Sequence, residues 1–118
     1  MHSDPTPQTR AEELVAQYLT SAGIKILDRN WRRSCGEISL IAQDGDTTAF
    51  VQVHAQTISP FQVPVAAVTF LKRQRLRRTA LLWLAEHDGP WWKIRFDVAA
   101  VLLDPDHESE VQYFQAAF

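Results

Sequence analysis

The clearest pattern in the chain is a helical repeat of apolar residues near its start. The apolar positions follow the spacing of one α-helical face and comprise Ala11, Leu14, Val15, Tyr18, Leu19 and Ala22. Thr9 and Glu12 fit the first and fourth positions of a capping box, and Gly23 fits the left-handed position that ends a helix. We therefore predict a helix over residues 9–22.

Shorter apolar patterns after this helix predict strands. Ile24, Ile26 and Leu27 open a short strand that we expect to end in a polar turn over residues 28–30. Residues 37–42 and 47–55 predict an antiparallel hairpin, because the Asp-Gly pair between them is a strong hairpin signal.

Side chains alternate between the two faces of a strand, so the hairpin residues can be sorted by face. The first strand is expected to carry Glu37, Ser39 and Ile41 on one face. The second strand is expected to carry on one face Phe50, Gln52, His54 and Gln56.

The second half of the chain predicts one more helix and one long strand. The helix covers residues 65–87, and its apolar stripe consists of Leu76, Ala80 and Trp83. Lys72 and Arg75 fall inside the neighbouring apolar arc, so an anion or water must meet that part of the helix. A strand follows over residues 94–103, and we expect the apolar end, residues 111–118, to pack back onto the domain.

The order helix, antiparallel strands, helix, strand predicts an α/β domain of two or three layers with a mixed sheet. Residues 1–8 contain two prolines and no periodicity, so we expect a flexible lead followed by a single domain over residues 9–118. A chain of 118 residues with 46% hydrophobic residues is typical of one globular domain.

The single cysteine, Cys35, excludes an internal disulfide and zinc sites built from several thiolates. No apolar run is long enough to cross a bilayer, and the first ten residues contain no signal-like segment. We therefore expect a cytoplasmic protein that does not engage a membrane.

The charge is unevenly distributed along the chain. Residues 47–85 contain no Asp or Glu, and their local charge of +5 leaves −7 for the rest of a chain whose net charge is −2. The cations of this window are Lys72, Arg73, Arg75, Arg77 and Arg78. Such a chain can present a cationic face to a polyanion although its average is acidic.

Several runs of residues carry a family resemblance. They are residues 23–27, 29–32, 36–42, 50–54, 67–69, 72–73, 95–98 and 116–118. In this order, over nearly the whole length, the chain resembles the YraN-type family of restriction-endonuclease-like proteins. The resemblance implies a restriction-endonuclease-like (Holliday-junction-resolvase-like) fold, with a mixed sheet flanked by helices.

The resemblance also implies where an active site would lie. The family has two sequence motifs, Gly-Glu-Ile-Asp-Leu-Ile and Phe-Val-Glu-Val-Lys-Thr-Arg. In them Asp and Glu hold a divalent metal, and Lys positions the attacking water or the phosphate. In this chain the positions of Asp, Glu, Lys and Arg are taken by Ser39, Gln52, His54 and Gln56. Glu12, the acid of the first helix, and Glu37 remain.

These replacements remove the charge that attracts a hard cation. Mg²⁺ prefers carboxylate oxygens. With a hydroxyl and an amide at the two metal-binding positions, the formal charge of these positions changes from −2 to 0. His54 replaces Lys poorly, because an imidazole is mostly neutral at pH 7. We therefore expect no metal cofactor and no metal-dependent nuclease activity. In the alternative, Mg²⁺ or Mn²⁺ binds weakly through Glu12, Glu37, His54 and either Asp44 or Asp46.

Structural roles compete with the catalytic ones. Glu12 is interpreted first as part of the capping box. Glu37 is expected to pair with Arg32 or Arg33. A neutral hydrogen-bonded cluster that fills the position of the metal would consist of Ser39, Gln52 and His54.

The sequence thus favours a protein that binds nucleic acid, most of all DNA, without cutting it. Its backbone contacts would come from Arg32, Arg33, Lys72, Arg73, Arg75, Arg77 and Arg78. The alternative is a protein–protein module that pairs with itself or with a DNA-processing partner through residues 111–118 and the Trp91-Trp92 pair. Those tryptophans are expected to be core or interface anchors more than stacking platforms for bases.

Overall fold

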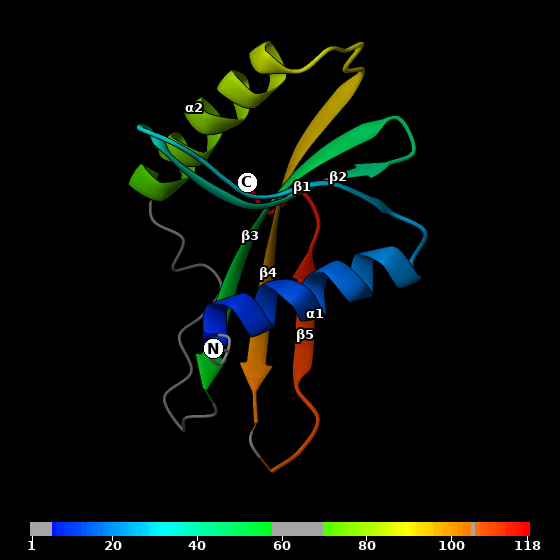
Figure 1. Cartoon of the computed structure of the whole chain (residues 1–118), viewed down its shortest axis with the longest axis vertical. Helices are drawn as coiled ribbons and strands as arrows, with labels where there is room; N and C mark the ends of the chain where they lie inside the picture. Colours follow the sequence, from blue (N-terminus) through cyan, green and yellow to red (C-terminus); the bar gives the residue numbers. More distant parts are fainter. Residues whose placement is uncertain (1–5, 58–69, 105) are drawn as a thin grey trace, which may run out of the picture.

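Five strands form one open mixed sheet in a computed structural model of the chain, which describes residues 6–57, 70–104 and 106–118 (Figure 1). The elements in chain order are α1 (Pro7–Ser21), β1 (Lys25–Arg33), β2 (Gly36–Asp44), β3 (Thr47–Thr57), α2 (Phe70–Glu86), β4 (Lys93–Leu103) and β5 (Glu110–Phe114). The strand order in space is the same as in sequence, β1-β2-β3-β4-β5. All neighbours are antiparallel except β3 and β4, which are parallel and joined by the segment that contains α2.

The two helices cover opposite faces of the sheet, so the domain has three layers. The core under α1 includes Ala11, Val15, Leu19, Leu40, Val51, Val53, Ala99 and Val101. The core under α2 includes Trp31, Ile38, Ile41, Phe50, Leu76, Ala80 and Trp83. The predicted α/β class with a mixed sheet is therefore confirmed. Neither helix in the described part of the chain is long and apolar enough to cross a membrane.

The first helix begins earlier than predicted. Thr6 is its N-cap, since the Thr6 side chain accepts a hydrogen bond from the Thr9 backbone N–H at 3.1 Å, and Pro7 occupies the first turn. Proline is well suited to that position because its missing N–H has no helical partner there. Thr9 is thus not the cap, and the predicted capping box with Glu12 is wrong. Residues 1–5 of the expected lead lie outside the described residues.

The polar segment over residues 28–30 is part of β1, where a turn was predicted. The strand continues to Arg33, with an irregularity in its pairing between Ile26 and Asp28 and a left-handed conformation at Asn30 (φ 48°). β1 is an edge strand that buries only Trp31 fully, so polar residues cost it little.

The predicted hairpin is confirmed, and Gly45 at its tip has φ 60°. The predicted face of Ser39 is wrong. Ile38 and Ile41 both contact the core under α2, while Leu40 belongs to the core under α1, so strict alternation breaks within β2. Ser39 consequently faces Glu12 and α1, opposite to Ile41.

The predicted apolar stripe of α2 is confirmed, because Leu76, Ala80 and Trp83 are all buried. The neighbouring arc lies mostly outside the core, with Leu71 62% and Leu82 39% exposed. The start of the predicted helix, residues 65–69, lies outside the described residues.

The C-terminal segment packs back onto the sheet as predicted. Strand β5 pairs with β4, and the Phe118 ring stacks on Phe96 at a centroid distance of 5.4 Å. A buried polar network holds this end, since Asp97 accepts hydrogen bonds from the Tyr113 hydroxyl, the Arg95 guanidinium and the Ala116 backbone N–H.

Candidate functional site

Strands β2 and β3 separate part-way along their length and create an opening at the residues singled out by the sequence. Their backbone pairing reaches Val51 on β3 and stops there. Beyond it, the Ser39 hydroxyl accepts a hydrogen bond from the Val53 N–H at 3.1 Å. The Gln8 side chain donates to the Val53 carbonyl at 2.7 Å and accepts from the Ala55 N–H at 3.3 Å. Side chains thus satisfy the edge of β3, and the strands can diverge without leaving buried backbone groups unpaired.

Two carboxylates, a buried one on α1 and an exposed one on β2, approach each other at this opening. Glu12 is only 6% exposed and is hydrogen-bonded by Gln8 at 3.4 Å and by Ser39. With its amide nitrogen turned toward the carboxylates, Asn30 donates to Glu12 at 3.0 Å and to Glu37 at 3.3 Å. The left-handed backbone of Asn30 positions this amide between the two acids.

The environment of Glu12 favours its protonated form. Burial raises the pKa of Glu12, and the nearby charge of Glu37 raises it further, while the hydrogen bonds from Gln8, Ser39 and Asn30 act in the opposite direction. Glu12 is therefore not a solvated helix-capping acid but a buried carboxyl at the base of the opening.

On the α2 side the opening widens into a hollow of about 350 Å³. It is lined by Gly36, Glu37, Gln52, Lys72, Arg75 and Leu76. Residues of β2, β3 and α2 thus meet here. We call this cavity the α2 hollow.

His54 lies two residues beyond Gln52 on the same strand and is half-buried. Burial lowers the pKa of His54, and the positive charge of Lys72 lowers it further. The imidazole is consequently neutral at pH 7. Its Nε2 atom is buried and has no hydrogen-bond partner among the residues that the structure describes. Because Ser39 bonds Val53 and Glu12 instead, the structure does not join Ser39, Gln52 and His54 into one hydrogen-bonded cluster.

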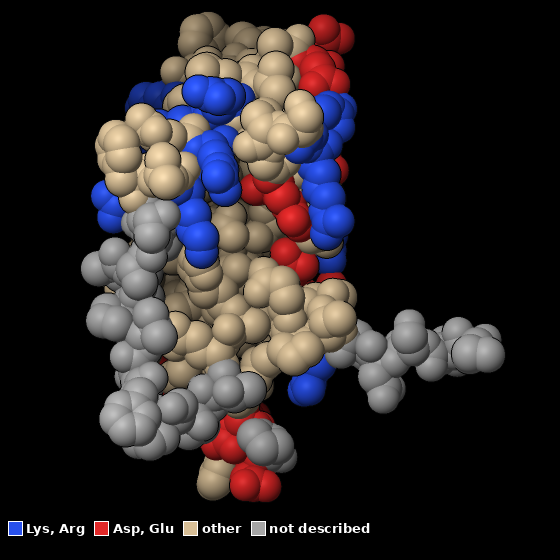
Figure 2. All heavy atoms as spheres, turned by 90° about the vertical axis from the view of Figure 1, so that its left-hand side faces the viewer, with Lys and Arg blue, Asp and Glu red and all other residues tan. Residues whose placement is uncertain are grey.

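The cations of α2 lie on more than one side of the helix, and only part of them borders this hollow. In Figure 2 the Lys and Arg side chains (blue) gather on the side of the molecule that carries α2, next to a recessed surface of uncharged residues. Arg73 and Arg77 lie over the Phe118 ring at 5.4 and 5.5 Å, and Arg77 also lies 5.8 Å from the Phe96 ring. Arg75 lines the hollow itself, and Arg78 is exposed.

The two arginines of β1 are engaged differently. Arg32 pairs with Glu37 at 3.4 Å, which confirms the expected partner of that carboxylate. Arg33 donates two hydrogen bonds to Glu86 at the end of α2 and stacks over Trp31 at 4.1 Å. Arg33 therefore stabilises the contact between β1 and α2 and is less available to a ligand than the α2 cations.

The other acids considered for a metal lie in ion pairs of their own. Asp44 accepts from Arg95 at 2.9 Å, and Asp46 pairs with Lys93 at 3.4 Å. Among the described residues, no three His, Cys, Asp or Glu side chains come together in an arrangement that could hold a metal ion. The acids left at the opening are Glu12 and Glu37, and both share Asn30 as a donor.

The tryptophan pair is divided between core and surface. Trp91 packs on Trp83 at 4.9 Å and donates to the His87 carbonyl at 3.3 Å, so it is a core anchor as predicted. Trp92 is 75% exposed.

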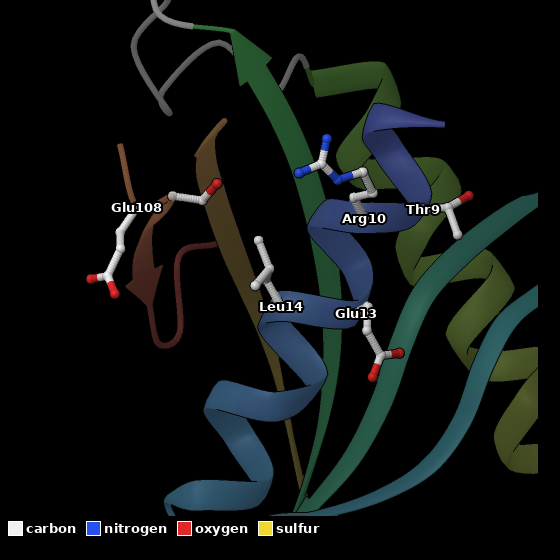
Figure 3. A pocket seen from close by; sticks show the side chains of 6 residues that line it. Thr9, Arg10, Glu13, Leu14 and Glu108 are labelled. Atoms are coloured by element: carbon white, nitrogen blue, oxygen red, sulfur yellow. The ribbon is translucent and has the colours of Figure 1, made fainter. Parts of the chain in front are cut away.

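A larger hollow, of about 620 Å³, lies on α1 away from the predicted residues (Figure 3). It is lined by Thr9, Arg10, Glu13, Leu14, Glu108 and Ser109. Its charged lining consists of one cation, Arg10, and two acids, Glu13 and Glu108, and Glu13 is already paired with Arg29 at 2.6 Å. This mixture gives the hollow no clear preference for a charged ligand.

Sequence reasoning missed Gln8 and Asn30. Gln8 was assigned to the flexible lead, although a proline next to it at residue 7 is a signal for a helix start. Asn30 was assigned to a turn, and asparagine is indeed the residue that most readily adopts a left-handed conformation outside glycine. The sequence pattern predicted a turn over residues 28–30 but not this conformation of Asn30, nor its place within a strand.

Comparison with known proteins shows clear relatives. Residues 11–101 match the sequence model of the family described as "Uncharacterised protein family UPF0102". A UPF0102 protein of Nocardia farcinica is 54% identical over 107 residues, which cover 91% of this chain and 84% of that protein. A UPF0102 protein of Rhodococcus opacus is 41% identical over 107 residues, 91% of each chain, and one of Beutenbergia cavernae is 45% identical over 91 residues, 77% of each. The matched residues extend from α1 to β4 and include every strand and helix that borders the opening.

Proposed function

The chain belongs to the UPF0102 family, and from that premise we propose that this member binds DNA through the cationic face of α2 without cutting it by a metal-dependent reaction. The five-stranded mixed sheet with a helix on each face is compatible with a restriction-endonuclease-like fold, which we propose as its architecture. The YraN-type resemblance of the motifs supports the fold and the DNA binding, and the departures from it at Ser39, Gln52 and His54 support the absence of cleavage.

The observation that carries the binding proposal is the charge of α2. Arg73, Arg75, Arg77 and Arg78 form no ion pair with an acid of the described residues, and Glu86 is the first acid of the helix, at its last position. Cations concentrated on one surface helix neutralise phosphates and release counterions, so affinity is independent of sequence and falls steeply with salt.

The donor set at the opening supports the absence of metal-dependent cleavage. A hard divalent cation is held by oxygen ligands, among which one or two ionised carboxylates supply the charge that attracts it. Here Ser39 and Gln52 supply neutral oxygens, and the charge of Glu37 is offset by Arg32. The remaining acid, Glu12, is buried, and burial raises its pKa, which disfavours the ionised form that a cation needs. Lys72 and Arg75 add positive charge to the same hollow. The residues present do not fit Mg²⁺ or Mn²⁺, and we derive no catalytic step through such an ion.

Fluorescence anisotropy with a labelled duplex, a four-way junction and a single strand across a salt series tests the binding. We expect log Kd to rise linearly with log salt. In the double variant Arg77→Gln/Arg78→Gln the slope should fall by roughly 0.9 for each phosphate that the variant no longer neutralises.

Arg10→Gln/Lys25→Gln is the matched control, because it removes the same charge from exposed positions away from α2. Binding that ignores salt, or an equal reduction in the control, would contradict the proposal.

Plasmid nicking with Mg²⁺ or Mn²⁺ tests the second part. We expect no nicking by the natural chain. The variant Ser39→Asp/Gln52→Glu/His54→Lys restores the family's charges and should gain metal affinity. Nicking by the natural chain that disappears in Glu12→Ala would show that the metal chemistry survives.

A partner protein is the second candidate, favoured by the 75% exposure of Trp92. Light scattering over a concentration series tests self-association, and Trp92→Ala should abolish any dimer that uses this side chain. A monomer at all concentrations would remove that form of the hypothesis.

A further inference from the structure

The walls of the α2 hollow are unusually rich in hydrogen-bond donors. Arg75 and Lys72 carry cationic N–H groups, and the Gln52 amide adds two neutral ones. Such a set matches an anion with several acceptor oxygens, for which a planar guanidinium provides two parallel hydrogen bonds.

A buried polar atom next to the hollow also supports an anionic ligand. His54 follows Gln52 on the same face of β3, and its Nε2 atom has no partner in the part of the chain that the structure describes. Buried polar atoms normally have a partner, so an unsatisfied one in a native site calls for an explanation. The Nε2 atom of a neutral imidazole can carry the proton and donate it to an oxygen that enters the hollow.

One acidic side chain, Glu37, is among the residues that line the hollow, and its charge is already offset. Glu37 pairs with Arg32 at 3.4 Å and accepts from the turned Asn30 amide at 3.3 Å. The two cationic side chains of the lining therefore outweigh its single carboxylate. The hollow is electrostatically suited to a small anion and unsuited to a divalent cation.

The volume limits what can enter. A hollow of about 350 Å³ corresponds to roughly a dozen water molecules at about 30 Å³ each. This accommodates a phosphate group with part of its sugar, whereas a whole base pair stays outside.

We propose that the α2 hollow binds one phosphate group directly, with Arg75 and Lys72 on its oxygens and Gln52 as a neutral donor, without a bridging metal ion. The inference rests on the proposed function in one respect, namely that DNA supplies the phosphate. It adds a defined site to the sequence-independent attraction of the helix face. The phosphate is either a backbone diester or a terminal monoester, which share the same oxygen chemistry.

An NMR titration of the full chain with inorganic phosphate in the presence of EDTA is the direct test. We expect saturable shifts of the Gln52 side-chain amide and of the His54 ring. In Arg75→Ala the Kd for phosphate should rise about tenfold, since the variant cannot form the charge-assisted hydrogen bond. Arg75→Ala keeps the Cβ and the carbonyl that Thr79 bonds, so the fold is retained.

Arg78→Ala is the matched control, because it removes the same charge from an exposed position of α2 that does not line the hollow. An unchanged Kd in this control supports the site. Shifts spread along α2 without Gln52 or His54, an equal weakening in both variants, or saturation only when Mg²⁺ is added would each overturn it.

Two labelled duplexes of one sequence, with a 5′-phosphate and with a 5′-hydroxyl, identify the source. If Arg75→Ala binds both duplexes more weakly than Arg78→Ala does, the phosphate comes from the backbone. If Arg75→Ala weakens binding of the phosphorylated duplex alone, the phosphate is the terminal one. Either result supports the site.

The two proposals can fail separately. If duplex binding depends on salt but phosphate causes no saturable NMR shifts in the hollow, the phosphate site is overturned and the proposed function stands. Saturable phosphate binding in the hollow with no affinity for any nucleic acid overturns the proposed function, while the anion site stands.

Discussion

At the scale of single residues, Glu12 shows how burial changes the role of a side chain. The sequence placed it at the solvated start of a helix, but the cap is Thr6 and Glu12 lies one turn further in, facing the sheet. A buried carboxyl near a second acid binds its proton more tightly in the folded state than in the unfolded chain.

The raised pKa of Glu12 predicts how stability depends on pH. Because the folded state binds the proton more tightly, the natural chain should gain stability relative to Glu12→Gln as the pH falls through the folded pKa toward the unfolded value near 4.5. Each unit of difference between the folded-state and unfolded-state pKa of Glu12 corresponds to about 1.4 kcal/mol of unfolding free energy. Urea unfolding of both proteins between pH 7 and pH 4 measures this difference. A natural chain that loses stability relative to Glu12→Gln as the pH falls would contradict the prediction.

Tyr113 is a second residue whose hydroxyl has a defined task. It donates at 2.6 Å to Asp97, which is completely buried, and both burial and this bond raise the pKa of Tyr113. Tyr113→Phe leaves the carboxylate with one donor fewer, so we expect a decrease of about 1–3 kcal/mol in unfolding free energy.

Tyr18→Phe is the control for this prediction. Tyr18 contacts Tyr113 with its ring at 5.6 Å but is about half exposed, at 48%. Removing its hydroxyl should change stability by less than about 0.5 kcal/mol. Equal effects of the two variants in denaturant unfolding would contradict the assigned role of the Tyr113 hydroxyl.

At the scale of elements, the connection between β1 and β2 is fitted closely against α2. A Cβ atom added at Gly36 would lie 2.8 Å from the Thr79 hydroxyl, and Gly36 has φ 157°. We expect Gly36→Ala to destabilise the protein by about 1–3 kcal/mol, since Thr79 is buried and already donates to the Arg75 carbonyl.

The matched control is Gly45→Asn in the β2–β3 turn. Gly45 has φ 60°, which asparagine tolerates, and no atom lies within 4 Å of its added Cβ. Thermal unfolding should therefore show a clearly smaller loss of stability for this variant. A similar loss in both variants would mean that the destabilisation by Gly36→Ala does not arise from the contact with α2.

The elements that could be predicted from the sequence are those with strong local signals. The hairpin followed from Asp-Gly between two apolar strands, and α2 followed from Leu76, Ala80 and Trp83. The length of β1 did not, because an edge strand needs few apolar residues and its polar ones resemble a turn. The orientation of Ser39 depends on the break in β2, which arises from the divergence from β3 and has no local signal.

The candidate site was predictable only in part for the same reason. The motifs identified Ser39, Gln52 and His54, and the charge pattern identified the α2 arginines. The partners that define their environment, Gln8 and Asn30, come from other elements and are recognised only when the chain is folded.

At the scale of the whole molecule, cations concentrate on α2 while the net charge is slightly acidic. Several of these cations lie three or four residues apart and repel each other, at roughly 0.2–0.5 kcal/mol per pair. We therefore predict that Arg78→Gln, which relieves the repulsion with Arg75 at an exposed position, is more stable than the natural chain at low salt.

Screening should reduce that gain as salt is added, because the Debye length falls from about 30 Å at 0.01 M to about 3 Å at 1 M. Thermal unfolding of both proteins across this range measures it. A difference that does not change with salt would contradict an electrostatic origin. A helix face that costs stability in the free protein is consistent with a surface kept for a polyanion.

The parallel pairing of β3 with β4 has a consequence for how the chain reaches this structure. Each β3 residue pairs with the residue 46 positions later, as Thr47 does with Lys93, so the central pair of the sheet closes a long stretch of chain. Loop closure of this length carries an entropic cost before any contact compensates it. Assembly should therefore be slow for a domain of this size, with the β2–β3 hairpin available early and the β3–β4 pairing formed last.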